Sequence, residues 1–185
     1  MPNDVVDLIM ADHREFERLL DQLRHHPETR PLAVPVLAAI LTAHSRAEEA
    51  EVYPVATSEA GESHEVEHSQ EEHEHAELLL VKLIETDPES AKFEDVLKEL
   101  ADSVTHHLEE EEATVLPGMR TRLDDARRAE LGAAFTAARA EHLGDRPGEA
   151  TRKELETQAR NLNMTGASDM NKARLERELK KRAKS

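Results

Sequence analysis

The chain has 185 residues, of which 38% are hydrophobic and 35% charged, and its net charge is −16, so it supports one domain with a lean core and a small appendage. It contains no cysteine, which excludes a disulfide framework, a thiolate metal site and a cysteine nucleophile. No apolar stretch approaches the ~20 residues that span a bilayer, and the N-terminus does not resemble a signal peptide, so we expect a cytoplasmic protein without membrane contact.

Five segments carry apolar residues at three- and four-residue spacing, which is the pattern of amphipathic helices. Segments rich in Pro, Gly and Ser separate the first four, and we expect the stretch ATSEAGES to be a loop. Four long helices joined by short loops predict an all-α protein, an up-down-up-down four-helix bundle with the fifth helix packed outside. The predicted helices are residues 3–25, 32–53, 64–85, 91–116 and 125–143.

The rest of the chain differs in charge from the bundle. Residues 150–185 carry ten Lys or Arg and five Asp or Glu, a net charge of +5, which leaves −21 for the first 149 residues. Thr151 and Glu154 form a capping box, and Asn171 can cap a second helix, so the end of the chain is a small helix-loop-helix module. We therefore expect a bundle domain at 1–143, a linker at 144–150 and a basic tail at 151–185.

A motif of eleven residues occurs twice, as HSRAEEAEVYP from His44 and as HLEEEEATVLP from His107. In each copy a glutamate follows the histidine by four residues, at Glu48 and Glu111, and residues so spaced lie on the same helix face. Inward-pointing pairs of this kind build dinuclear metal sites in helix bundles. The repeat therefore predicts two metal-binding pairs.

Two further histidines, His13 and His73, each lie on the apolar stripe of a helix, with apolar residues at −7, +3, +7 and +10. They raise the number of candidate ligands to six. Imidazole and carboxylate without thiolate suit iron, manganese or zinc. Burying carboxylates without cations is costly, which argues against a metal-free core.

Some neighbouring histidines remain alternatives. His68 or His75 can replace His73 as the ligand from the third helix, although their run of charged residues is also typical of a solvated face. His106 competes with His107, which we prefer because its spacing to the following proline equals that in the first copy.

Taken together, these residues resemble the hemerythrin-like (HHE cation-binding) family over residues 1 to 143. The resemblance includes the Asp-His pair at Asp12 and the sequences EExxVYP and EExxVLP, which end the two copies of the motif. The resemblance implies a four-helix bundle holding two iron ions with oxo and carboxylate bridges, although manganese and zinc accept the same donors. It implies bridging by two glutamates and terminal ligation by four histidines, with Glu77 as an extra ligand. These are Glu48 and Glu111, and His13, His44, His73 and His107.

The third helix departs from the oxygen-carrying members, which place two histidines there four residues apart, whereas this chain has His73 and Glu77. An anionic ligand stabilises the ferric state, so we expect redox turnover rather than reversible oxygen carriage. Catalase-like decomposition of hydrogen peroxide is our first prediction. The alternative is a protein that binds O2 or NO, or senses iron or redox state, without turnover, and a metal-free bundle with a purely structural role is the third.

Other features stay open. Tyr53, which ideal helix geometry turns away from the face of Glu48, is either a packing aromatic or a ligand or redox-active phenol at the iron. The tail resembles SAP-like or Rho-N-terminal-like modules, which implies weak, salt-sensitive nucleic-acid contact; tethering or protein contact is the alternative. We expect a monomer or weak dimer. Its expected partners are small oxygen species and a redox partner of unknown identity.

Overall fold

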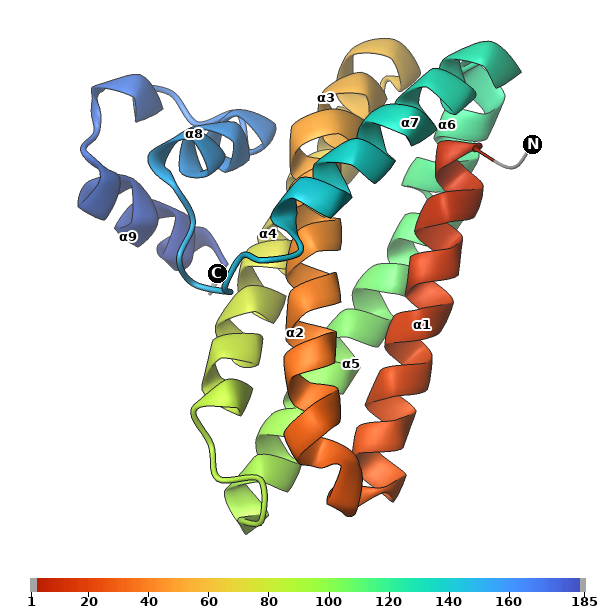
Figure 1. The fold of residues 1–185 in the computed structure, drawn as a ribbon. Coiled ribbons are helices and arrows are strands. Elements are labelled where there is room, and N and C mark those ends of the chain that lie inside the picture. The colour runs from red at the N-terminus through yellow and green to blue at the C-terminus, as the bar shows by residue number, and fades with distance from the viewer. Residues whose placement is uncertain (1–2, 184–185) are drawn as a thin grey trace.

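A computed structural model describes residues 3–183 of the chain (Figure 1). These residues form helices and turns and contain no β-strand, so the prediction of an all-helical protein is confirmed. Residues 1, 2, 184 and 185, which the predicted domain ranges include, lie outside the described part. The helices are α1 (Val5–His25), α2 (Arg30–Ala47), α3 (Tyr53–Val55), α4 (Ser63–Ile84), α5 (Ala91–Ala113), α6 (Val115–Arg122), α7 (Asp125–His142), α8 (Arg152–Asn161) and α9 (Lys172–Arg182).

Four long helices, α1, α2, α4 and α5, lie side by side and form the bundle (Figure 1). The buried apolar residues of the bundle and of the shorter segments packed on it form two separate clusters, which on α1 lie on either side of its middle. The first apolar cluster includes Phe16, Leu37, Leu80 and Leu97, and the second includes Ile9, Tyr53, Val66 and Leu116. On α1, α2 and α4 the predicted histidine lies in sequence between residues of the two clusters, and on α5 His107 lies near the end of the first cluster, so the bundle contains a polar layer between two apolar ones.

The helical segment that begins with α2 continues beyond the predicted end of the second helix at residue 53. After Ala47 the chain continues through a π-helical turn, Glu48–Val52, through α3, and through a second π-helical turn, Ala56–Ala60. Pro54 has no N–H to donate to the preceding turn, and the wider π turns let the helix pass it. The predicted loop from Ala56 is therefore mostly helical, and the chain reverses only at Gly61, whose φ is 78°.

The fourth helix ends earlier than predicted. Thr114, with φ −123° and ψ −79°, separates α5 from α6, so the predicted helix 91–116 is two helices. Pro117 lies in the first turn of α6, where a backbone N–H would have no partner within the helix. The break therefore removes the conflict that a proline inside one continuous helix would create.

The predicted fifth helix forms as α7, capped by Asp124, and packs against α1 and α2 (Figure 1). Leu131 and Phe135 are its buried apolar residues. A Cβ atom at Gly132 would lie 2.0 Å from the carbonyl oxygen of Asn3, so glycine permits the close approach of α7 to the start of α1.

The tail forms a helix pair with its own small core, which includes Leu155, Ala159, Leu175 and Leu179. Thr151 and Glu154 make the predicted capping box at the start of α8, and Asn171 caps α9. The pair packs on the bundle beside α4 and the π turn at Glu48–Val52 (Figure 1). Its likeness to SAP or Rho-N-terminal modules stays a prediction. Within residues 3–183, no helix is long and apolar enough to cross a bilayer.

Candidate metal centre

The polar layer brings together six of the predicted ligands from four helices. Four are histidines, one from each long helix. The other two are glutamates, of which one directly follows α2 and one lies near the end of α5. All six are buried, and the exposed fraction of Glu48 is 0% and that of Glu111 is 1%. The six are His13 on α1, His44 on α2, His73 on α4, His107 on α5, Glu48 and Glu111.

The Nε2 atoms of these histidines point at one another and at the carboxylates. His44 Nε2 and His73 Nε2 lie 3.1 and 3.4 Å from the same oxygen of Glu48. His13 Nε2 lies 3.3 Å from Glu111 Oε2, and His73 Nε2 lies 3.1 Å from His107 Nε2. This is the arrangement that converging metal ligands require.

Several of these buried atoms have no hydrogen-bond partner among the described residues. They are His13 Nε2, His44 Nε2 and both oxygens of Glu48 and of Glu111. A buried carboxylate without hydrogen bonds is costly, and protein charges buried in this way are usually paired or bound to a metal. The donor set therefore fits one or more cations bound in the layer.

The other ring nitrogen of each histidine contacts a carboxylate from a neighbouring helix. These contacts fix the ring orientation and leave Nε2 free to face the centre, as in carboxylate–histidine–metal triads. The pairs form a closed ring around the bundle, in which each helix orients the histidine of the next. The Nδ1 contacts are His44 with Asp12 at 3.0 Å, His73 with Glu49 at 3.3 Å, His107 with Glu72 at 3.0 Å and His13 with Glu112 at 2.9 Å.

Sequence reasoning assigned no role to this ring, although a signal was present. Each of the four carboxylates is adjacent in sequence to a predicted ligand: Asp12 to His13, Glu49 to Glu48, Glu72 to His73 and Glu112 to Glu111. Neighbouring residues on a helix point about 100° apart, so one of each pair faces the centre and the other reaches the adjacent helix.

Burial and charge shift the protonation of the metal-free layer. Burial alone lowers the pKa of His44, but Glu48 and Asp12 outweigh it and raise the pKa to about 9. The pKa of His73 rises to about 10 because Glu48 and Glu49 outweigh burial in the same way. Burial raises the pKa of Glu48, but the two histidines hold it well below its usual value. A metal must therefore displace protons from the imidazoles when it binds.

Not every candidate from the sequence joins the layer. Glu77 is half-buried, accepts a hydrogen bond from the Gly148 N–H at 3.0 Å, and lies 3.6 Å from Arg46, away from the six converging side chains. His75 is exposed. The alternatives His68 and His106 lie outside the layer as well, so the histidines that α4 and α5 place in it are His73 and His107.

Tyr53 does reach the layer, because the π turn at Glu48–Val52 rotates it from the direction expected for a regular α-helix. Its hydroxyl lies 3.0 Å from His73 Nε2 and is fully buried. Burial, then Glu111, Glu48 and Glu49, raise the pKa of Tyr53 well above its usual value. In the metal-free layer the side chain is therefore a neutral phenol.

A small cavity lies beside His73, between α2, α4 and α8, with room of about 20 Å³ for water-sized molecules. This is close to the space that one water molecule needs. Its lining includes three buried polar atoms without hydrogen-bond partners, Thr42 Oγ1, Glu74 Oε1 and Gln158 Oε1. The cavity can therefore hold a small polar molecule next to the layer.

The tail contacts the orienting ring directly. Gln158 Nε2 donates to Glu49 Oε2 at 3.1 Å, and Asn161 Nδ2 donates to the Glu49 carbonyl at 3.0 Å and to Gln70 Oε1 at 2.9 Å. Glu49 in turn contacts His73. Helix α8 is thus part of the hydrogen-bond network around the centre, which the sequence did not predict.

Glu74 provides a test of these electrostatics in metal-free protein. Burial, then Glu49 and Glu77, raise the pKa of Glu74 to about 8. Folding therefore binds a proton between about pH 4.5 and pH 8, and the free energy of unfolding falls as pH rises through this window. We expect Glu74→Gln to stabilise the metal-free protein by on the order of 1 kcal/mol at pH 9 and much less at pH 5, as measured by urea unfolding.

Glu71→Gln on the same helix is the matched control and should give the same difference from wild type at both pH values. A Glu74→Gln effect that did not depend on pH would show that Glu74 is ionised throughout, against this account.

The fold and the buried imidazole–carboxylate layer define an all-helical metal-binding protein. The family model of the hemerythrin HHE cation binding domain matches residues 4–119, which is more than half of the chain. The chain therefore belongs to the hemerythrin HHE cation-binding family, as the resemblance in its sequence predicted. The described His and Glu clusters fit a metal-binding site of the kind that typically holds iron.

A protein described as a DNA nickase from Nostoc sp. (strain PCC 7120 / SAG 25.82 / UTEX 2576) is 27% identical over 150 residues. The match covers 80% of this chain and 42% of that relative, so the chain spans less than half of the relative's length. No solved structure matches the chain significantly.

Proposed function

We propose that this protein holds two iron ions in the polar layer of an up-down-up-down four-helix bundle and decomposes hydrogen peroxide. The observation that carries the proposal is the convergence of four buried imidazoles on two carboxylates whose oxygens have no hydrogen-bond partner among the described residues. Two groups of candidate ligands, each with its ligand atoms within 4.8 Å of one another, share Glu48. A shared carboxylate is what a pair of adjacent cations requires.

The residues that would hold the metal are the six of the layer. Glu48 and Glu111 have both oxygens available to bridge, and the four histidines each offer Nε2. When bound, a pair of iron ions supplies two-electron redox chemistry, by which one peroxide is reduced to two waters while a second is oxidised to dioxygen. Manganese suits the same donors and the same chemistry, whereas zinc has no redox chemistry.

The chain's own groups would control access and protons. The cavity of about 20 Å³ beside His73 has room for about one water-sized molecule, so it would favour small species such as hydrogen peroxide or a diatomic gas over larger substrates. Thr42 and Gln158 offer it unpartnered oxygens. The Tyr53 hydroxyl, 3.0 Å from His73 Nε2, carries a proton in the otherwise closed layer and can donate it to a reduced oxygen species.

The experiment is oxygen evolution from hydrogen peroxide by iron-loaded protein, with iron content measured on the same sample. We expect one dioxygen for every two peroxides consumed. Tyr53→Phe should keep its iron and lose roughly tenfold or more in rate, because it removes a positioned proton donor. Its absorption spectrum also separates a neutral phenol from a phenolate ligand, because only the loss of a ligand removes a charge-transfer band. Iron-loaded protein that decomposes peroxide no faster than iron-free protein would disprove the proposal.

A second candidate function is binding of O2 or NO, or sensing of iron or redox state, without turnover. The contact of α8 with Glu49 favours it, because the orienting carboxylate of His73 is held by the tail. A change in the position of His73 would therefore reach α8. Reversible spectral change on addition of the gas, without oxygen evolution from peroxide, would support this function over the first.

The name of the Nostoc relative suggests DNA cleavage as an activity, but we do not propose this activity for the buried centre. A cavity of about 20 Å³ admits no phosphodiester, and a chain of net charge −16 repels nucleic acid. Weak nucleic-acid contact by the basic tail, whose α9 ends in Lys180, Lys181 and Arg182, remains a separate proposal. Nicking of supercoiled plasmid by iron-loaded protein would contradict this assignment.

A further inference from the structure

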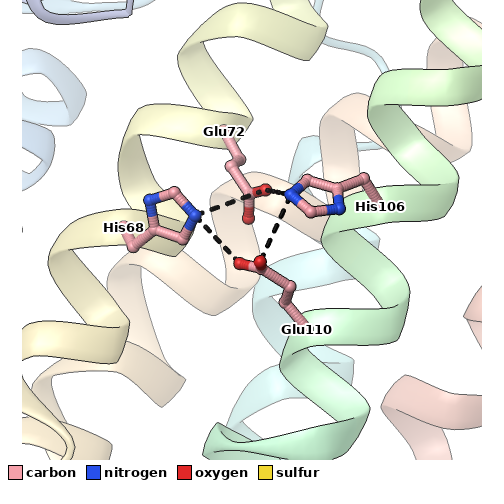
Figure 2. A group of neighbouring side chains, drawn as sticks. All are labelled: His68, Glu72, His106 and Glu110. Carbon is pink, nitrogen blue, oxygen red and sulfur yellow. Dashed lines mark ion pairs between the residues drawn. The ribbon is translucent and has the colours of Figure 1, made fainter.

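A second group of possible metal ligands lies outside the buried layer, across α4 and α5. Figure 2 shows two histidines and two glutamates pointing toward a common centre between the two helices. Their ligand atoms all lie within 4.8 Å of one another. The residues of this outer cluster are His68 and Glu72 on α4 and His106 and Glu110 on α5.

The outer cluster repeats, on a more exposed face, the spacing used in the buried layer. In each helix a histidine is followed by a glutamate four residues later, so both side chains lie on one helix face. The sequence offered His68 and His106 only as alternatives to the buried ligands. The structure instead places them opposite each other, because α4 and α5 pack closely along this face.

The distances match those of a tetrahedral site. Four ligand atoms at the usual ~2.0 to 2.1 Å from a zinc ion lie about 3.3 Å from one another. The nitrogen–oxygen contacts in the outer cluster are His68 to Glu110 at 2.9 Å, His106 to Glu110 at 3.2 Å, and His68 and His106 to Glu72 at 3.7 Å each. A cation can therefore be accommodated with small side-chain movements.

Charge and access also favour a cation. Two neutral imidazoles and two carboxylates supply a charge of −2, which a divalent ion neutralises, and the acidic surface attracts cations. The exposed fractions of the His68 and His106 side chains are 49% and 61%, so solvent reaches the cluster. Three of its residues, His68, His106 and Glu110, line a surface hollow together with His64 and Glu109.

We propose that His68, Glu72, His106 and Glu110 bind one divalent transition-metal ion of the zinc or ferrous iron class. The site is separate from the buried layer and needs no metal there. It gives a role to two of the seven histidines that the buried centre does not use.

Glu72 links the outer site to the buried layer. Its Oε1 faces His68 and His106, while its Oε2 lies 3.0 Å from His107 Nδ1. A cation on Oε1 withdraws electron density from the carboxylate, so Oε2 becomes a weaker acceptor for His107 and the imidazole a weaker donor at Nε2. Resting on the proposed function, this link predicts a higher reduction potential of the iron-loaded centre when the outer site is filled.

The test compares zinc binding by wild type, His68→Gln/His106→Gln and His75→Gln, using iron-free full-length protein and isothermal titration calorimetry. We expect wild type and His75→Gln to bind one more zinc ion per chain than the double variant. Zinc affinity at the outer site should be more than about 100-fold lower in the double variant than in wild type. This exceeds the loss of roughly 10- to 100-fold that is typical when a residue that only orients a metal ligand is removed. Circular dichroism checks that all three proteins are folded.

Equal zinc stoichiometry and affinity in wild type and the double variant would overturn the proposal. The comparison is independent of the iron chemistry, because any zinc taken up by the buried layer is common to all three proteins. The link through Glu72 is read separately, from the potential of iron-loaded wild type and double variant with and without zinc. A shift of the same size in both would refute the link and leave the outer site standing.

Discussion

Replacing Glu48 with glutamine is expected to remove most of the iron that we propose for the buried layer, from the proposed two ions per chain to fewer than one. Glu48 is the residue shared by both buried groups of candidate ligands, and its two oxygens have no hydrogen-bond partner among the described residues. A neutral amide of the same shape cannot bridge two cations, and it leaves the bound charge uncompensated. Metal analysis of protein loaded anaerobically with ferrous iron and then desalted measures the loss.

Glu51→Gln is the matched control, since Glu51 lies in the same π turn and is not one of the converging ligands. It should retain the wild-type iron content. Glutamine fills the space of glutamate, so we expect the Glu48→Gln protein to keep its fold. Circular dichroism checks this, and so separates loss of the metal site from loss of the fold. Full iron content in the Glu48→Gln protein would mean that Glu48 does not ligate the metal.

Removing the metal should produce the second large effect, on stability. Metal present at about 1,000 times its dissociation constant is expected to raise the free energy of unfolding by about 4 kcal/mol over chelator-treated protein. The physical source is the buried Glu48 and Glu111, whose oxygens gain partners when a cation is bound. Urea unfolding at pH 7, with and without ferrous iron under anaerobic conditions, measures the difference.

This stabilisation should depend on pH with a definite sign. In the metal-free protein the raised pKa values of His44, about 9, and His73, about 10, keep both imidazoles protonated at neutral pH. Their ion pairs stabilise the metal-free fold below pH 6.5, and that contribution is lost as pH rises through 9 to 10. Metal competes with these protons, so the stability gained from metal should be larger at pH 8 than at pH 6.

The Glu48→Gln protein serves as the control and should show little metal-dependent stabilisation. If wild type unfolded at the same urea concentration with and without iron, or if the difference grew as the pH fell, the account of the buried layer would be wrong.

The ring of orienting carboxylates explains how four separate helices hold one centre. Asp12 orients His44, and the same relation continues from helix to helix until Glu112 orients His13. A small displacement of one helix therefore affects a histidine on its neighbour as well as its own. Because α8 binds Glu49, the tail contributes to the same network.

Much of the fold was predictable because it depends on local periodicity. Apolar spacing of three and four residues located the long helices, and the capping residues Thr151 and Asn171 located the short ones. The same periodicity placed His13 and His73 on apolar stripes and put His44 one turn from Glu48. A residue's direction relative to the apolar face of its own helix is a local property, so sequence alone can determine it.

What the tertiary structure decided depends on how elements meet. The π turn rotated Tyr53 into the layer, whereas Glu77, one turn from His73, turned toward Arg46 and Gly148. The crossing of α4 and α5 created the outer cluster, and the docking of α8 brought Gln158 to Glu49. These contacts join residues far apart in the chain, and spacing along one helix contains no information about the rotation and packing of its neighbours.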